Sequence, residues 1–172
     1  REARHRLTLL QAPAPLLDIS GADAPIHVSI IERPPMDLRQ LTPNLAVSPQ
    51  IELSDVALLA RSGFKTLVNN RPDEEDGAID HEVMAKAAAD AGMEYHYLPF
   101  RPGQITPDLI QGFSAALEGP KPAIAFCRSG NRSTVLWALG QAGKMSEAEV
   151  LNTAAEAGYA LSGVVPLIRS LA

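Results

Sequence analysis

The stretch Pro122-Ala-Ile-Ala-Phe126, followed directly by Cys127-Arg-Ser-Gly-Asn-Arg132, decides the fold that we expect for this chain. Its first five residues are apolar and uninterrupted, which is typical of a short strand buried on both faces. A helix is predicted from about Arg132 to Ala142. A buried strand that passes through a tight polar loop into a helix indicates an α/β domain.

Strands and helices alternate on both sides of this stretch. Further strands are predicted at 44–48, 65–70 and 94–100, and further helices at 54–62, 79–91, 107–118, 146–157 and 162–171. Alternation at this spacing predicts a mainly parallel central sheet flanked by helices. A chain of 172 residues suits one such domain.

The first 35 residues differ from the rest of the chain. They carry five of the fourteen prolines and show no sustained hydrophobic period. We therefore expect a poorly ordered extension or linker at 1–35 and the globular domain at 36–172. The alternative is a docking segment, because Ile26-His-Val-Ser-Ile-Ile31 reads like a strand.

Composition and charge exclude several classes of protein. The net charge of −5 argues against non-specific nucleic-acid binding, which needs a basic face. No apolar run approaches the roughly 20 residues that span a bilayer, and the first residues are too broken by proline for a secretory signal. One cysteine allows no intramolecular disulfide, so we expect a cytoplasmic protein. The four histidines are scattered and lack ligand spacing, so we expect neither a metal site nor a cofactor.

Cys127 lies where the buried strand ends and the helix begins, at the sheet edge where α/β folds bind ligands. The unpaired N–H groups and partial positive charge of a helix N-terminus favour thiolate, the nucleophilic form of cysteine. Arg132 is suited to binding an oxyanion through two parallel N–H bonds. We predict Cys127 and Arg132 as catalytic residues, in an anion-binding loop that also contains Arg128, Ser129, Gly130, Asn131 and Ser133.

Three loop residues have distinct expected roles. Gly130 permits backbone angles that are closed to other residues, so that successive N–H groups converge on one centre. Arg128 raises the positive potential, and Ser133 adds a hydroxyl near the sulfur. The competing interpretation is that Cys127 simply packs in the core. A packing site has no use for two arginines and a glycine, so the catalytic interpretation is favoured.

Beyond this loop, the chain from Met36 to about Pro166 resembles the phosphatase-like domain of beta-lactamase hydrolase-like proteins, a bacterial family. The resemblance rests on Leu45-Ala-Val-Ser-Pro-Gln50, Val68-Asn-Asn-Arg-Pro-Asp73, Tyr97-Leu-Pro-Phe100, Cys127-Arg-Ser-Gly-Asn-Arg-Ser133 with Leu136-Trp137, and Ala157-Gly-Tyr159. It implies a tyrosine/dual-specificity-phosphatase-like fold and a phosphatase-like catalytic domain at 36–172. Some members are fused to a metallo-hydrolase-like domain and linked to sulfide handling, whereas others are catalogued as phosphatases. A fused or separate metallo-hydrolase-like domain is thus a candidate partner.

Two features distinguish a sulfurtransferase from a phosphatase within that resemblance. Tyrosine phosphatases place five residues between cysteine and arginine. This loop has four, and so resembles the loop of rhodanese sulfurtransferases, which holds a cysteine persulfide. Phosphoester cleavage is also helped by a general acid, yet the loop 99–104 contains no carboxylate. Both features favour a sulfurtransferase that forms a persulfide on Cys127, with a small anionic sulfur donor such as thiosulfate and an external thiol acceptor.

Two alternatives stay open. One is a phosphatase that forms a phosphocysteine at the same sulfur, with a phosphoester as substrate. The other is a non-enzymatic anion-binding or redox-sensing module. An acid for the phosphatase would come from Asp73-Glu-Glu-Asp76, although such a run is usually just a solvated loop. Asp73 is thus a possible site residue, as is Arg71, which would either face the pocket or pair with this acidic loop.

Overall fold

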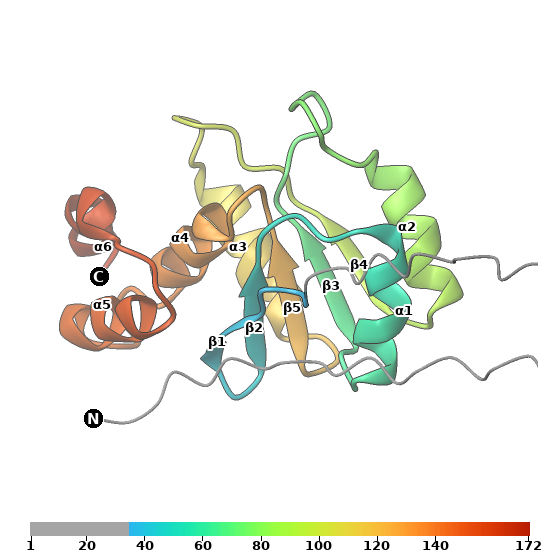
Figure 1. Ribbon diagram of the computed structural model, residues 1–172. Helices are drawn as coiled ribbons and strands as arrows, with labels where there is room; N and C mark the ends of the chain where they lie inside the picture. Colours follow the sequence, from blue (N-terminus) through green and yellow to red (C-terminus); the bar gives the residue numbers. More distant parts are fainter. Residues whose placement is uncertain (1–34) are drawn as a thin grey trace, which may run out of the picture.

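A five-stranded sheet forms the centre of the molecule in the computed structural model, which describes residues 35–172 (Figure 1). The strand order is β1-β2-β5-β3-β4. Four strands run parallel, and β1 is an antiparallel edge. The prediction of a mainly parallel sheet is confirmed. The strands are β1 Arg39–Thr42, β2 Leu45–Ser48, β3 Thr66–Asn69, β4 Glu94–Tyr97 and β5 Ala123–Phe126.

Helices cover both faces of the sheet, as predicted (Figure 1). One face carries α1 (Leu53–Arg61) and α2 (His81–Asp90), and the other carries α3 (Pro107–Leu117) and α4 (Asn131–Gly140). The remaining helices pack against α4 on the side away from the sheet. They are α5 (Glu147–Glu156), the short 3-10 helix η1 (Ser162–Val164) and α6 (Val165–Leu171).

Alternate residues of the central strand β5 supply two separate cores. Ala123 and Ala125 point to the core shared with α3 and α4, whereas Ile124 and Phe126 point to the core shared with α1 and α2. This is the period of two that a strand imposes on its side chains. Every residue of β5 is buried, in agreement with its uninterrupted apolar sequence.

Helix α4 is the most enclosed helix of the described chain. All residues from 133 to 139 are buried, because the sheet and α3 cover one side and α5 and α6 cover the other. Trp137 is among them, at 2% exposure, and packs the helix into the core as expected. The first turn of α4 is therefore held in a fixed position relative to the cysteine loop that precedes it.

Several elements differ from the sequence prediction: β4 ends at Tyr97 rather than at Phe100, and the predicted helix 162–171 begins with the 3-10 helix η1. Strand β1 was not expected, because Arg-Gln-Leu-Thr is polar and only four residues long. Its edge position requires just one buried side chain, Leu41. Helix α1 begins at Leu53 rather than after Ser54, with Glu52 as N-cap, and the Asp55 carboxylate accepts a 2.8 Å hydrogen bond from the Glu52 N–H.

The predicted extension falls almost wholly outside the described residues, and so does the strand-like stretch 26–31. Within residues 35–172 no helix is both long and apolar enough to cross a lipid bilayer.

We predict that a protein shortened to begin at Met36 folds by itself, because among residues 35–172 both cores are formed by side chains from 36 onward. Its thermal midpoint should lie within a few degrees of that of the full chain, which corresponds to about 1 kcal/mol. Thermal unfolding followed by circular dichroism measures this. A loss of several kcal/mol would instead favour the docking segment at 26–31.

Candidate active site

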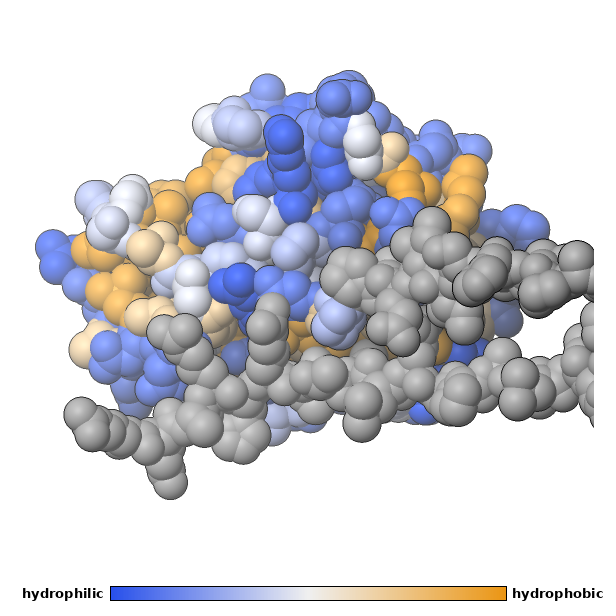
Figure 2. Space-filling model, in the orientation of Figure 1, coloured by the Kyte–Doolittle hydropathy of each residue, from blue (hydrophilic) through white to orange (hydrophobic). Residues whose placement is uncertain are grey.

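The sheet topology brings three loops together at the carboxyl edge of the strands. Strand β5 lies between β2 and β3, with Phe126 in register with both Ser48 and Asn69. The loops that follow these three strands therefore lie side by side. Backbone hydrogen bonds join them: Asn70 N–H donates to the Phe126 carbonyl at 2.8 Å, and Gln50 N–H to the Arg128 carbonyl at 3.4 Å. Figure 2 shows this upper end of the molecule covered mainly by hydrophilic side chains.

Cys127 occupies the first position after β5 and is fully buried. Its Sγ accepts a hydrogen bond from the Gly130 N–H at 3.1 Å. Gly130 has a φ of +87°, a left-handed conformation that favours glycine, and it is the N-cap of α4. The loop thus turns back so that one of its own N–H groups points at the Cys127 sulfur.

Several backbone donors around the sulfur are left open. At the start of α4 the Asn131 N–H donates to Ser129 Oγ at 3.3 Å, and the first N–H to donate to a backbone carbonyl is that of Thr134, to Gly130 at 3.1 Å. Among the residues that the structure describes, the N–H groups of Arg128, Ser129, Arg132 and Ser133 have no acceptor. Open donors at a helix N-terminus form a site for an oxyanion. The side chains of Arg128, Ser129 and Asn131 are exposed at its mouth.

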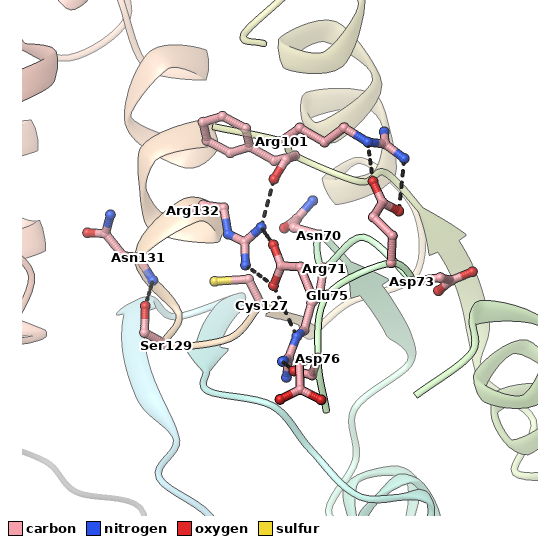
Figure 3. A network of polar contacts seen from close by, with 12 residues as sticks. Asn70, Arg71, Asp73, Glu75, Asp76, Arg101, Cys127, Ser129, Asn131 and Arg132 are labelled. Atoms are coloured by element: carbon pink, nitrogen blue, oxygen red, sulfur yellow. Dashed lines mark hydrogen bonds and ion pairs between the residues drawn. The ribbon is translucent and has the colours of Figure 1, made fainter. Parts of the chain in front are cut away.

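Arg132 presents two edges of its guanidinium to different partners (Figure 3). Nη1 and Nη2 donate to the two carboxylate oxygens of Glu75, the Nη2 bond being 2.8 Å, and Nη1 also donates to the Phe100 carbonyl at 2.8 Å. Hydrogen bonding to Glu75 chiefly raises the pKa of Arg132, and the adjacent Cys127 sulfur adds to this effect. A hydrogen bond to the Cys127 sulfur also contributes to this shift. Within residues 35–172 no oxygen accepts from the Nε–H, so the guanidinium keeps donor capacity for an anion beside the sulfur.

Glu75 is held by a second arginine as well. Arg71, only 5% exposed, donates from Nε to Glu75 Oε2 at 3.2 Å, from Nη1 to Gln50 Oε1 at 2.9 Å and from Nη2 to the Asp76 carbonyl at 2.6 Å. Of the two options for Arg71, pairing with the acidic loop is the one observed. Hydrogen bonding to Arg132, and then the charges of both arginines, lower the pKa of Glu75, so this carboxylate stays ionised.

The interpretation of the acidic run as a solvated loop is therefore wrong for Glu75. It holds for Glu74, whose side chain is 57% exposed and pairs with Arg101. Sequence reasoning missed Glu75 and Gln50 as residues that organise the site. The four-residue spacing of Arg71 and Glu75 could have predicted their ion pair. Only the fold brings Arg132 to the same carboxylate.

Ser133 is buried, and its hydroxyl donates to a residue other than Cys127. Its Oγ donates to Asn70 Oδ1 at 2.8 Å, and Asn70 Nδ2 donates to the Leu98 carbonyl at 2.9 Å. Asn70 therefore joins α4 to the segments that follow β3 and β4. The sequence predicted that the Ser133 hydroxyl lies near the sulfur to assist it. The hydroxyl instead supports the loop through its hydrogen bond to Asn70.

Asp73 belongs to a neighbouring cluster with Asp80 and His81 rather than to the sulfur. Its carboxylate accepts from the His81 backbone N–H at 3.0 Å and pairs with His81 Nδ1, which raises the pKa of that imidazole. The ring of His81 stacks on Tyr97 at 4.1 Å. Asp80 caps α2, because it accepts from the N–H groups of Glu82 and Val83. These contacts account for the cluster as the start of α2.

Tyr159, which follows α5, closes the loop from the opposite side. Its hydroxyl donates to the Ser129 carbonyl at 3.1 Å, and Arg39 of β1 lies over its ring at 5.1 Å. The sequence marked Ala157-Gly-Tyr159 only as a stretch shared with a family. Nothing in its local pattern shows that it reaches a residue thirty positions away.

Comparison with known proteins agrees with this geometry. The family described as beta-lactamase hydrolase-like protein, phosphatase-like domain, matches residues 37–144. A beta-lactamase hydrolase-like protein of Agrobacterium fabrum is 33% identical over 105 residues, which cover 60% of this chain and 24% of that protein. One from Xylella fastidiosa is 31% identical over 119 residues, or 67% of this chain and 28% of that protein. This chain spans about a quarter of the length of these curated relatives.

Solved structures extend the likeness to phosphatases. A candidate phosphatase from Neisseria meningitidis superposes with a TM-score of 0.69 and 28% identity, covering 78% of this chain and 97% of that one. TpbA of P. aeruginosa, in complex with pTyr, gives 0.53 and 20%, covering 72% and 76%. The core catalytic domain of the S. cerevisiae PP-IP phosphatase SIW14 gives 0.58 and 14%, covering 76% and 82%. The predicted tyrosine/dual-specificity-phosphatase-like fold is confirmed.

Replacing Glu75 with glutamine should destabilise the domain by about 1–3 kcal/mol, because two partly buried guanidiniums lose the negative carboxylate that they both bind. Glu74→Gln is the matched control and should cost far less, since its pair with Arg101 is exposed. Because folding lowers the pKa of Glu75, the advantage of wild type is full above the unfolded-state value and disappears as the pH falls through the folded-state value. Urea unfolding of the three proteins between neutral and acid pH measures this difference. Equal stabilities of the two variants would contradict it.

Gly130→Ala should disrupt the loop by more than backbone strain alone. An added Cβ would lie 2.1 Å from the Tyr159 hydroxyl oxygen, at a φ of +87°. Gly92→Ala is the control, because its φ is +74° and nothing lies within 4 Å of the added carbon. The control should lose about 1–2 kcal/mol from strain. Gly130→Ala should lose more, by thermal unfolding, and should also lose any activity that depends on Cys127. Similar losses in both variants would show that the close approach of Tyr159 is unimportant.

Proposed function

The chain belongs to the family of phosphatase-like domains of beta-lactamase hydrolase-like proteins, and from that membership we propose that it is a cysteine-dependent hydrolase of phosphate monoesters. One observation carries this proposal above all. Cys127 Sγ accepts the Gly130 N–H at 3.1 Å, beside an arginine edge and open backbone donors suited to an oxyanion. Thiolate nucleophile and anion cradle are thus combined in one loop.

The substrate phosphoryl group would lie over Cys127. Its oxygens would accept from the open N–H groups of the loop and from the guanidinium of Arg132. The thiolate attacks phosphorus, an S–P bond forms, and the bond from phosphorus to the ester oxygen breaks. Water then attacks the phosphocysteine, which releases inorganic phosphate and regenerates the thiolate.

The leaving group restricts which esters are suitable. The segment between β4 and α3 contains no aspartate or glutamate, and Glu75 is kept ionised by two arginines, so it is unsuited to donating a proton. Esters whose oxygen departs as a weakly basic anion, such as aryl phosphates, need no such donor. We therefore propose aryl rather than alkyl phosphates as the substrate class.

A second candidate is sulfur transfer. The missing acid and the spacing of the cysteine loop both favour it. Four residues rather than five separate Cys127 from Arg132, which narrows the cradle. Sulfite, the group that leaves when the thiolate takes the outer sulfur of thiosulfate, also departs without a proton. The resulting Cys127 persulfide would pass its sulfur to an external thiol, because the chain has no second cysteine. A fused or separate metallo-hydrolase-like domain is a proposed partner for that product.

Parallel assays with an aryl phosphate, an alkyl phosphate, and thiosulfate plus a thiol separate these reactions. We expect aryl phosphate turnover, little alkyl phosphate turnover, and a phosphate adduct on Cys127 by mass spectrometry. Cys127→Ser should abolish turnover. Arg132→Lys should lower kcat/KM by about 1–3 kcal/mol of transition-state binding, since lysine lacks the two-bond fork. Arg169→Lys is the control. This arginine lies on α6 and also forms two hydrogen bonds with a carboxylate, that of Glu147.

Two outcomes would overturn the first proposal. If thiosulfate turns over far faster than aryl phosphate and leaves a sulfur adduct on Cys127, the second candidate replaces it. If no substrate is turned over but anions still bind, the loop is a binding or sensing module.

A further inference from the structure

Tyr159 makes a contact with the cysteine loop that packing alone does not require. The side chain belongs to the core between the sheet and α4, and the residue is 7% exposed. Its ring would fill the same space without a hydroxyl. The hydroxyl nevertheless donates to the Ser129 carbonyl at 3.1 Å. That carbonyl belongs to the peptide whose N–H, on Gly130, donates to Cys127 Sγ.

We propose that Tyr159 is a positioning residue that orients the Ser129–Gly130 peptide and thereby stabilises the thiolate of Cys127. A trans peptide is planar, and its C=O and N–H groups point in opposite directions. Holding the carbonyl toward Tyr159 therefore holds the N–H toward the sulfur. The inference rests on the proposed function only in taking Cys127 as a thiolate nucleophile.

The close approach of Tyr159 and Ser48 to Gly130 explains why the Ser129 carbonyl has one orientation. A Cβ on Gly130 would lie 2.1 Å from the Tyr159 hydroxyl oxygen and 3.2 Å from the Ser48 carbonyl oxygen. The peptide is thus confined between β2, Tyr159 and the sulfur. A hydrogen bond that donates to a thiolate favours the charged form.

The hydroxyl keeps its proton under working conditions. Burial raises the pKa of Tyr159 to about 12, despite the opposing charge of Arg39. The residue therefore acts as a neutral hydrogen-bond donor over the whole range in which a cysteine titrates. The Arg39 side chain is itself held by Asp37 and by the Ala157 carbonyl, at 3.2 Å, which supports the ring from behind.

The test is the pH at which Cys127 becomes a thiolate in Tyr159→Phe and in wild type. The chain contains one cysteine, so ultraviolet thiolate absorbance, corrected with Cys127→Ser in each background, reports that sulfur alone. Tyr159→Phe should move the midpoint upward by roughly 0.5–1 pH unit. Tyr95→Phe is the matched control. Tyr95 is partly buried and burial likewise raises its pKa to about 12, but its hydroxyl accepts from Asn69, so the Cys127 midpoint in this variant should equal that of wild type.

A second measurement needs no variant. In wild type, the NMR signal of the Gly130 amide should move through the titration together with the thiolate absorbance. An unchanged midpoint in Tyr159→Phe overturns the proposal, and so does a Gly130 amide that ignores the titration if the variant fails to fold. Neither measurement uses a substrate. A shifted midpoint without phosphate ester turnover would therefore uphold the role of Tyr159 while refuting the proposed function.

Discussion

The hydrogen bond from the Gly130 N–H to Cys127 Sγ joins the last buried strand to the first turn of α4. It requires a φ of +87°, which only glycine adopts readily. It also requires that both flanks be fixed, and the fold supplies this on each side. Strand β5 is anchored between two parallel neighbours, and α4 is enclosed on all sides. The loop is then short enough for the Cys127 sulfur and the open backbone donors to lie close together.

Charge pairing around this loop sets the character of the site. Arg132 and Arg71 share the carboxylate of Glu75, so the guanidinium of Arg132 is oriented before any ligand arrives. The same pairing keeps Glu75 ionised, which removes it as a proton donor. The ion pairs thus both orient Arg132 and remove Glu75 as an acid, and the segment between β4 and α3 offers no other carboxylate. Both the aryl phosphate and the thiosulfate chemistry are compatible with a leaving group that departs without a proton.

The fold could be predicted well from the sequence because its signals are local. The apolar run 122–126, the breaks at Gly92 and Gly158, and the cap at Thr106 each act over a few residues. Strand β1 escaped prediction because an edge strand needs little apolar surface. The cysteine loop was also predictable, since its residues are contiguous and the chemistry follows from their types.

The sequence by itself determined the α/β architecture and singled out Cys127 and its loop as the candidate site, because each depends on residues close together in the chain. Only the tertiary structure decided the partners of that loop. Glu75 reaches Arg132 across 57 positions, Ser133 reaches Asn70 across 63, and Tyr159 reaches Ser129 across 30. These contacts follow from the strand order and from the packing of α5 against α4. Hydrogen bonds between distant segments depend on how the sheet is assembled, and no local period or spacing encodes that assembly.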